Sequence, residues 1–329
     1  MRIGITGGTG SLGSALIAEL VRRRLGPIVT ITRDELKSHL LNQQYGGLAG
    51  EVRVHTVPAG VSDAQRLGDV FRGCDVLIHA AALKRVDQFT YGSAESMLQA
   101  NVLGTRHVLR MALEVGIRKV LVISSDKASA PINVYGVSKA LVEALAVEFN
   151  AYSIPRGMAV AVARWGNCMG SRGSVLHQWR AQAAAGQALT LTDSRMTRFW
   201  LSLAEAVTYT LEWLDVLRGG EIFVPQLPSA KLVDIAAAVA PGAALVVTGR
   251  RAGGEKLHEQ LLNEEEPMRT VARSGQRPYY LVTPSVRAWS VSPYPGTPIP
   301  AELVYRSDLN PNWLGPEAIA ALVLEPPAQ

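Results

Sequence analysis

Short runs of almost continuous apolar residues recur along the first half of the chain, with longer, more polar segments between them. They read RIGIT at 2–6, IVTIT at 28–32, VRVHTV at 52–57, DVLIHA at 75–80, KVLVIS at 119–124 and AVAVAR at 159–164. Strands of this kind, separated by helices, are typical of a parallel sheet that is covered on both faces. We therefore predict a doubly wound α/β domain over residues 1–165.

Beyond residue 165 the alternation loosens into short strands, helices and proline-rich loops. EIFVPQLPS at 221–229 and SPYPGTPIP at 292–300 are examples of these loops. We expect residues 166–329 to form a smaller C-terminal substrate-binding domain, with a segment near 202–227 returning to the first domain. Ligands of open parallel sheets bind outside the carboxyl ends of the strands, so the site is expected where the two parts meet.

Composition narrows the classes of partner. The 329 residues include 33 Lys and Arg against 28 Asp and Glu, a formal net charge of +5. The basic residues are not interleaved with aromatic ones, so nucleic acid is not an expected partner. Two cysteines, Cys74 and Cys168, are typical of a reducing compartment. The longest apolar run, near 235–247, is too short to span a bilayer, and we expect a cytoplasmic protein without a membrane segment.

The turn after the first apolar run has the pattern of a dinucleotide-binding loop. ITGGTGSLGSAL at 5–16 places Gly7, Gly10 and Gly13 between a strand and a helix. Glycines there let the backbone approach a pyrophosphate that is held at the positive end of the helix. An ordinary tight turn is the alternative. The loop favours a Rossmann sheet that binds a nicotinamide dinucleotide.

The end of the second apolar run bears on the choice of cofactor. NAD-binding enzymes usually place an acid there to hold the adenosine ribose, whereas this chain has Thr32 and Arg33 first and Asp34 only afterwards. An arginine can pair with the 2'-phosphate of NADP, so NADP is favoured over NAD. Asp34 could instead take the ribose.

Tyr135 and Lys139 form a candidate catalytic pair. They are four residues apart, hence on one face of a helix that begins near the turn at 131–133. A free tyrosine titrates near pH 10, but a neighbouring lysine cation and the cationic nicotinamide both favour its phenolate. Tyr135 could then accept a hydroxyl proton while the cofactor accepts hydride.

Seven further stretches carry a family resemblance. They are TRDELK at 32–37, HAAALK at 79–84, SSDKASAPINVYGVSK at 124–139, RWGNCMGSRGSV at 164–175, MTRFWLSLAEAV at 196–207, GGEIFVPQLPS at 219–229 and GEKLHE at 254–259. With the glycine loop, they make the chain resemble the extended short-chain dehydrogenase/reductase superfamily. Within it, the chain is similar to the inverting UDP-N-acetylglucosamine 4,6-dehydratases. The Asp-Lys before Tyr-x-x-x-Lys is the most specific feature, because other sugar-nucleotide dehydratases usually have Asp-Glu there.

The resemblance implies roles for the acid and the amine at 126 and 127. After oxidation at C4 of the sugar, with Tyr135 as base and Ser125 holding the C4 oxygen, Lys127 would remove the C5 proton. Asp126 would protonate the departing C6 hydroxyl. Hydride would then return to C6, and C5 would be reprotonated on the opposite face. An exposed ion pair on a loop is the alternative explanation of Asp126 and Lys127.

The resemblance also implies two sets of binding residues. The expected cofactor contacts are Gly7, Thr9, Gly10, Ser11, Leu12, Gly13, Thr32, Arg33, Asp34, Lys37, Val61, Ala80, Ala81, Ala82, Lys84, Asn101, Tyr135 and Lys139. The expected substrate contacts are Lys84, Asn167, Arg172, Ser174, Val175, Thr197, Arg198, Arg251, Glu255 and His258. The expected substrate is a UDP-sugar and the expected assembly a homo-oligomer. No metal is expected, because His258 has no partner at ligand spacing.

Several positions depart from the family pattern. Gly60 stands where the family usually has an aspartate near the adenine, Arg85 and Asp87 replace His and Pro beside the expected substrate, and Gln226 replaces a Lys. These departures keep a related 5,6-dehydratase or an epimerase of the same superfamily open as alternatives. A non-catalytic dinucleotide-binding protein is a third reading, and the intact Ser125, Tyr135 and Lys139 set argues against it.

Overall fold

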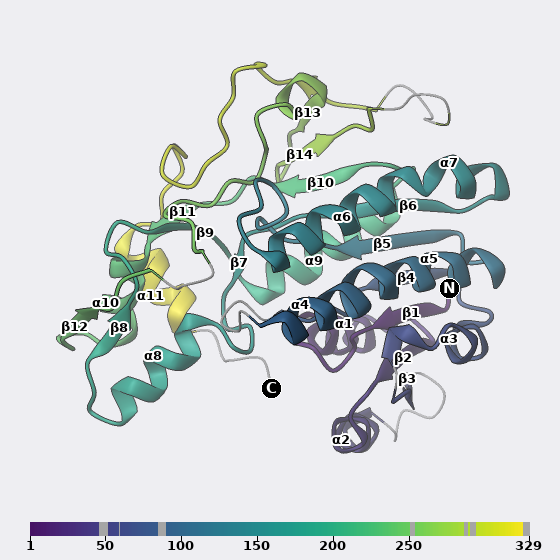
Figure 1. The fold of residues 1–329 in the computed structure, drawn as a ribbon, viewed down its shortest axis with the longest axis horizontal. Helices are drawn as coiled ribbons and strands as arrows, with labels where there is room; N and C mark the ends of the chain where they lie inside the picture. Colours follow the sequence, from purple (N-terminus) through teal and green to yellow (C-terminus); the bar gives the residue numbers. More distant parts are fainter. Residues whose placement is uncertain are drawn as a thin grey trace.

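The computed structural model describes residues 1–45, 52–58, 60–84, 90–250, 254–285, 289 and 294–324. In this part of the chain a ten-stranded sheet has the order β15-β13-β14-β10-β6-β5-β4-β1-β2-β3 (Figure 1). From β3 to β10 all neighbouring strands are parallel. Figure 1 shows helices in front of and behind this sheet, as predicted for a doubly wound α/β fold.

The predicted strands are all present, within one or two residues at each end. They are β1 Ile3–Thr6, β2 Ile28–Thr32, β3 Val52–Thr56, β4 Val76–His79, β5 Lys119–Ile123 and β6 Ala159–Ala163. Four of them, β1, β2, β4 and β6, are buried along almost their whole length. A strand covered on both faces must be apolar throughout, which is why the sequence pattern predicted this sheet well.

Helices cover the two faces of the sheet. The helices of this region are α1 Ser11–Arg22, α2 Glu35–Tyr45, α3 Ala64–Phe71, α4 Tyr91–Met97, the π-helical η2 Leu98–Leu103, α5 Gly104–Glu114, α6 Val134–Glu148, α7 Asn150–Ser153 and α9 Leu203–Val216, with 3₁₀ turns η1 Gly60–Ser62 and η3 Ile154–Arg156. α1 packs beside α9, while α5 packs beside α3 and α6. Among the described residues, no helix is both long and apolar enough to cross a membrane.

The later part of the chain also contributes to the large sheet. β10 Ile222–Pro225 lies parallel to β6, and β14 Tyr279–Val282, β13 Thr270–Arg273 and β15 Thr297–Pro298 follow it in antiparallel register. The sequence predicted a returning segment near 202–227, which contains α9 and β10, but not the three antiparallel strands. β13 is only half-buried over most of its length, so it lacks the continuous apolar pattern of the earlier strands.

A second group of elements lies beside the carboxyl ends of the parallel strands (Figure 1). It comprises β7 Asn167–Cys168, α8 Val175–Ala184, β8 Leu189–Leu191, β9 Thr197–Leu201, β11 Ser229–Lys231, α10 Leu232–Val239, β12 Leu245–Val247 and α11 Pro316–Leu324. The turn η4 Pro267–Arg269 instead leads directly into β13 of the large sheet. Trp179, Trp200 and Ile235 belong to a separate hydrophobic cluster here. The main hydrophobic core is not confined to residues before 165, because it contains Trp165, Trp213 and Phe223. The ring centroids of Trp165 and Trp213 are 5.6 Å apart, and those of Trp213 and Phe223 are 5.2 Å apart. The domain boundary at residue 165 stays a prediction.

Candidate active site

The glycine loop joins β1 to α1, and its glycines let the neighbouring backbone lie close to it. Gly7 has a φ of +75°, and a Cβ on it would lie 2.8 Å from the backbone nitrogen of Ala81. The Gly10 amide donates to the Gly7 carbonyl at 2.9 Å. Gly10 caps α1, and no side chain of the described residues accepts a hydrogen bond from its first turn. The first amides of α1 are therefore available to an anion.

The end of β2 lies beside the loop that follows β3. The hydroxyls of Thr9 and Thr32 are 3.2 Å apart. The Arg33 side chain covers Gly60, because a Cβ on Gly60 would meet Arg33 Cδ at 2.9 Å. Asp34 Oδ1 accepts the Lys37 amide at 3.0 Å, and this bond lowers the pKa of Asp34. The Asp34 carboxylate thus caps the first turn of α2, and Arg33 is the side chain that faces the Gly60 turn.

The alanines after β4 lie beside the end of β1 and its glycine loop. The amides of Ala80 and Ala81 bond to the carbonyl and the hydroxyl of Thr6, at 3.1 and 3.3 Å. Asn101 in η2 is buried and holds this loop: its Oδ1 accepts the Leu83 amide at 2.7 Å and its Nδ2 donates to the Ser138 hydroxyl at 3.1 Å. Asn101 therefore ties the loop to α6. Val61 is also buried, beside Gly104.

Helix α6 carries Tyr135 and Lys139, as the spacing predicted. It begins at Val134 because Asn133 Oδ1 accepts the Gly136 amide at 2.9 Å. Burial raises the pKa of Tyr135 to about 12, although the Lys127 cation and a hydrogen bond with Ser125 act in the opposite direction. Lys139 donates to the Ile123 carbonyl at 2.8 Å, and burial lowers its pKa to about 8.

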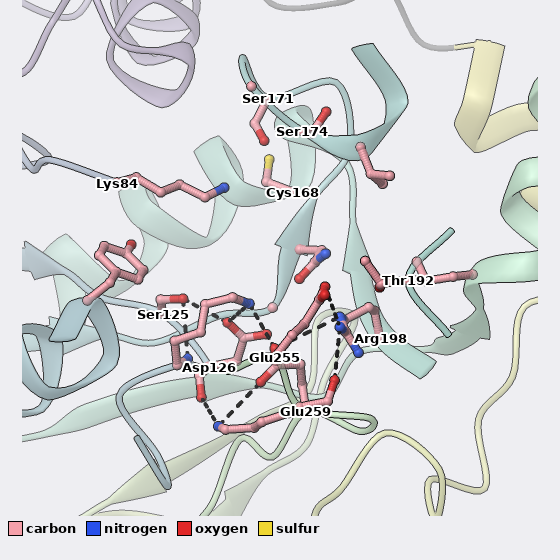
Figure 2. A pocket seen from close by; sticks show the side chains of 18 of the residues that line it. Lys84, Ser125, Asp126, Cys168, Ser171, Ser174, Thr192, Arg198, Glu255 and Glu259 are labelled. Carbon is pink, nitrogen blue, oxygen red and sulfur yellow. Dashed lines mark hydrogen bonds and ion pairs between the residues drawn. The ribbon is translucent and has the colours of Figure 1, made fainter. Parts of the chain in front are cut away.

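Asp126 and Lys127 lie on the loop that follows β5, next to Tyr135 in the wall of one pocket. Asp126 Oδ1 accepts hydrogen bonds from the Ser125 hydroxyl at 2.7 Å and from Lys127 Nζ at 2.9 Å (Figure 2). The Asp126 side chain is 1% exposed and that of Lys127 22%. The explanation of these two residues as an exposed surface ion pair is therefore wrong.

A second carboxylate, which the sequence reasoning missed, reaches Lys127 from the other side. Glu259 Oε1 lies 3.1 Å from Lys127 Nζ, and Glu259 Oε2 lies 3.3 Å from Lys256 Nζ. Arg198 Nε is 3.9 Å from the same carboxylate (Figure 2). Burial would raise the pKa of Glu259, but the cations Lys127, Arg198 and Lys256 outweigh burial and lower it to about 2.

The protonation of Lys127 follows from these contacts. Burial and the Arg198 cation lower the pKa of its amine, whereas Asp126 and Glu259 raise it, and the net shift is upward. Lys127 is therefore an ammonium in the ligand-free protein. Lys84 faces the same pocket, where the surrounding protein and the Lys127 cation lower its pKa.

The pocket between the two groups of elements has a volume of about 550 Å³. Of the expected substrate contacts, the structure brings six into its wall: Lys84, Asn167, Ser174, Val175, Arg198 and Glu255. Residues that the sequence reasoning did not select also line it, among them Cys168, Gln178, Thr192, Trp200 and Lys256. Figure 2 shows the Lys84 side chain pointing toward Cys168.

Three expected substrate contacts, Arg172, Thr197 and His258, lie outside the wall of this pocket. Thr197 and His258 bond to each other at 2.9 Å, and His258 lies 3.8 Å from Asp308, so their side chains face the segment at 307–308. The Arg172 amide donates to the Ser11 hydroxyl at 2.9 Å and its guanidinium donates to the Thr9 carbonyl, which joins the glycine loop to the substrate side. Arg251, like Arg85 and Asp87, falls outside the described residues.

The sequence GEKLHE carries no signal that singles out Glu259. The segment is extended rather than helical, and Thr197 forms a parallel bridge with His258. Lys256 and Glu259 turn to the pocket while His258 turns away. Since no sequence run predicted a strand here, the sequence alone did not tell which residues face the ligand.

Comparison with known proteins places the chain in a family. A sequence profile described as "Polysaccharide biosynthesis protein" matches residues 3–277. The chain belongs to this family. It is 33% identical to a UDP-N-acetylglucosamine 4,6-dehydratase (inverting) of Campylobacter jejuni, over 97% of this chain and 96% of that protein. It is 35% identical to a UDP-glucose 4-epimerase of Rickettsia prowazekii, over 80% of this chain and 77% of the relative.

This member of the polysaccharide biosynthesis family also resembles a solved structure over almost all of its length. Its fold superposes on that of Pen from Bacillus thuringiensis with a TM-score of 0.88, at 25% identity, over 98% of this chain and 96% of the other. The chain is an enzyme of the extended short-chain dehydrogenase/reductase superfamily, as the motifs predicted.

Proposed function

We propose that the protein is an NADP-dependent sugar-nucleotide 4,6-dehydratase that acts on UDP-N-acetylglucosamine or a related UDP-sugar and inverts C5. The observation that carries this proposal is the 2.9 Å contact between Asp126 and Lys127 in the wall of the pocket that Tyr135 also lines. An acid and an amine beside a Tyr-Lys pair suit an elimination coupled to hydride transfer. The similarity to the Campylobacter jejuni dehydratase, at 33% over 97% of the chain, supports the substrate class.

The chain's own residues fit a nicotinamide dinucleotide. The amides at the start of α1 suit its pyrophosphate, and a side chain at Gly7 would close the approach by contacting Ala81. NADP is preferred over NAD because Arg33 covers the Gly60 turn while the Asp34 carboxylate is engaged with the Lys37 amide. When bound, the cofactor would supply a hydride acceptor for C4 of the sugar and a hydride donor for C6.

Oxidation at C4 requires a base for the hydroxyl proton. Tyr135 takes that proton, and Ser125, whose hydroxyl donates to Asp126 at 2.7 Å in the structure, turns this donation to the C4 oxygen when the sugar binds. Burial raises the pKa of Tyr135 to about 12, the Lys127 cation opposes this shift, and any further positive charge beside the ring would lower the pKa. The ketone at C4 then makes the C5 proton acidic.

Elimination requires an amine and a carboxylic acid, but the resting pair is an ammonium and a carboxylate. One proton moving from Lys127 Nζ to Asp126 Oδ1, across 2.9 Å, produces both required forms. Lys127 then takes the C5 proton, and Asp126 gives its proton to the departing C6 hydroxyl, which leaves as water. This step restores the ammonium and the carboxylate, so the pair needs no outside acid or base for the elimination. C5 afterwards receives a proton on the opposite face.

The test is the fate of UDP-N-acetylglucosamine in the presence of the protein and NADP, followed by mass spectrometry. A 4,6-dehydratase gives a product lighter by one water that gains deuterium from borodeuteride at its ketone. A 5,6-dehydratase gives the same mass but no ketone, and an epimerase leaves the mass unchanged. Either of the last two results would refute the proposed reaction.

A further inference from the structure

Glu259 occupies an unusual position, because it binds the amine of the acid–base pair without being a member of it. Its carboxylate is 3% exposed, and Oε1 lies 3.1 Å from Lys127 Nζ, on an ammonium that also donates to Asp126 at 2.9 Å. Its other oxygen, Oε2, faces Lys256 at 3.3 Å. Lys256 in turn lies 3.5 Å from the Asp126 carbonyl. The two carboxylates thus hold one ammonium between them.

The proton that Lys127 must surrender is therefore held by two anions. Transfer to Asp126 neutralises one ion pair, but it also removes the cation that faces Glu259. We propose that Glu259 is a positioning residue that sets the proton equilibrium between Lys127 and Asp126, and through it the pH range in which elimination runs. The catalytic consequence of this inference rests on the proposed function. The effect of Glu259 on the protonation of Lys127 is independent of that function.

Other charges around Lys127 limit the effect of Glu259. Arg198 from β9 and Lys84 from the loop after β4 are cations, and the Tyr135 hydroxyl faces the pair from α6. Glu255 forms an ion pair with Arg198 at 3.3 Å, and Lys256 forms one with Glu259 at 3.3 Å. Removing the Glu259 charge leaves Lys127 with Asp126 as its one ion-pair partner among the described residues. The amine of Lys127 should then lose its proton more readily.

Glu259→Gln separates charge from shape, since the amide keeps an oxygen that can accept from Lys127. An opposite charge at this range shifts a pKa by about 1 to 3 units. The reactive pair keeps one shared proton, so loss of the Lys127 proton sets the basic limb of the pH dependence of dehydration, and we expect this limb to move to lower pH by that amount. Lys256→Met should move the same limb to higher pH, because Glu259 then acts on Lys127 without a competing cation.

A control variant distinguishes charge from general damage. Glu221 is also a buried carboxylate, but it accepts the amides of Arg218 and Gly219, both at 2.6 Å, at the start of β10. Glu221→Gln should lower the melting temperature while leaving the pH limb in place. If Glu259→Gln lowers the rate at every pH without moving the limb, Glu259 is merely structural and the inference is wrong.

The second readout does not depend on activity. The chain has seven lysines, so protein labelled with ¹³C-lysine gives few Cε resonances, and Lys127→Arg identifies that of Lys127. In the parent protein we expect this resonance to stay at its ammonium position throughout the pH range in which the protein is folded. In Glu259→Gln it should move to the amine position at lower pH.

The two arms separate the possible failures. A moved Lys127 resonance in a protein that does not dehydrate sugar nucleotides would support the role of Glu259 and refute the proposed function. An unmoved resonance in an active dehydratase would refute the role of Glu259 and leave the function standing.

Discussion

At the residue scale, the proposed mechanism divides two chemical steps between neighbouring side chains. In it, Tyr135 and Lys139 serve the hydride step, whereas Lys127 and Asp126, joined at 2.9 Å, serve the elimination. The proposal also has oxidation at C4 precede the removal of the C5 proton. The two steps should therefore be separable by mutation.

Tyr135→Phe should stop both steps, because no base remains for the C4 hydroxyl. Lys127→Ala should bind NADP and still reduce it transiently, yet dehydrate about 100 to 10,000 times more slowly, as expected for a missing general base. Single-turnover absorbance of the cofactor and product analysis measure the two steps separately. If Lys127→Ala abolishes cofactor reduction, Lys127 belongs to the hydride step and the assignment is wrong.

Arg33 is the residue on which the cofactor preference rests. Arg33→Ala should weaken NADP binding by about 1.5 to 3 kcal/mol, the worth of a charge-assisted hydrogen bond, and leave NAD binding almost unchanged. Isothermal calorimetry with both cofactors measures this difference. Equal losses for NADP and NAD would contradict the preference.

At the element scale, a buried ion network fixes α6 relative to the segment that carries Glu259. Arg164, at the end of β6, donates to Glu143 of α6 at 2.5 and 3.0 Å and to Glu266 at 2.7 and 2.8 Å. It also donates to the Leu261 carbonyl at 2.9 Å. The helix with Tyr135 and the segment 254–266 thus share one anchor.

Arg164→Met should destabilise the fold by about 3 to 5 kcal/mol, because it leaves two buried carboxylates without their cation. Arg22→Met, which removes an exposed pair with Glu19, is the matched control and should leave the stability almost unchanged. Urea denaturation of both variants measures the difference. Similar losses in the two variants would show that the buried network does not anchor these elements.

Elements differ in how far the sequence predicts them. β4, for example, is buried along its whole length, so its sequence is almost continuously apolar and easily recognised. β13 lies between β14 and the edge strand β15 and is half-buried over most of its length, so its pattern is ambiguous. The same reason applies to the site. Tyr135 and Lys139 share a helix whose period predicts their common face, whereas Glu259 meets Lys127 across 132 positions of sequence, and that meeting depends on tertiary packing.

At the scale of the whole molecule, the pocket is closed on one side by the Rossmann sheet and on the other by the C-terminal elements. Arg172 links the two parts through Ser11 and Thr9. Enclosure of a bound sugar between these two parts would exclude water from the proposed 4-keto intermediate. The homo-oligomer expected from the sequence stays a prediction, which size-exclusion chromatography with light scattering can test.

The proposed cycle returns the hydride to the sugar that supplied it. Turnover should therefore proceed with a catalytic amount of NADP and without added oxidant. The NADPH concentration, measured from its absorbance, should stay below the enzyme concentration throughout the reaction. NADPH that accumulates in proportion to product would instead indicate a simple dehydrogenase.

The most direct test of the central claim is the reaction with UDP-N-acetylglucosamine in heavy water, followed by NMR of the product. Removal of the C5 proton by Lys127 and return of the C4 hydride to C6 predict a 6-deoxy-4-keto sugar with deuterium at C5 and none in the C6 methyl group. Solvent deuterium in the methyl group, or a dehydrated product whose C5 keeps its original hydrogen, would contradict this account.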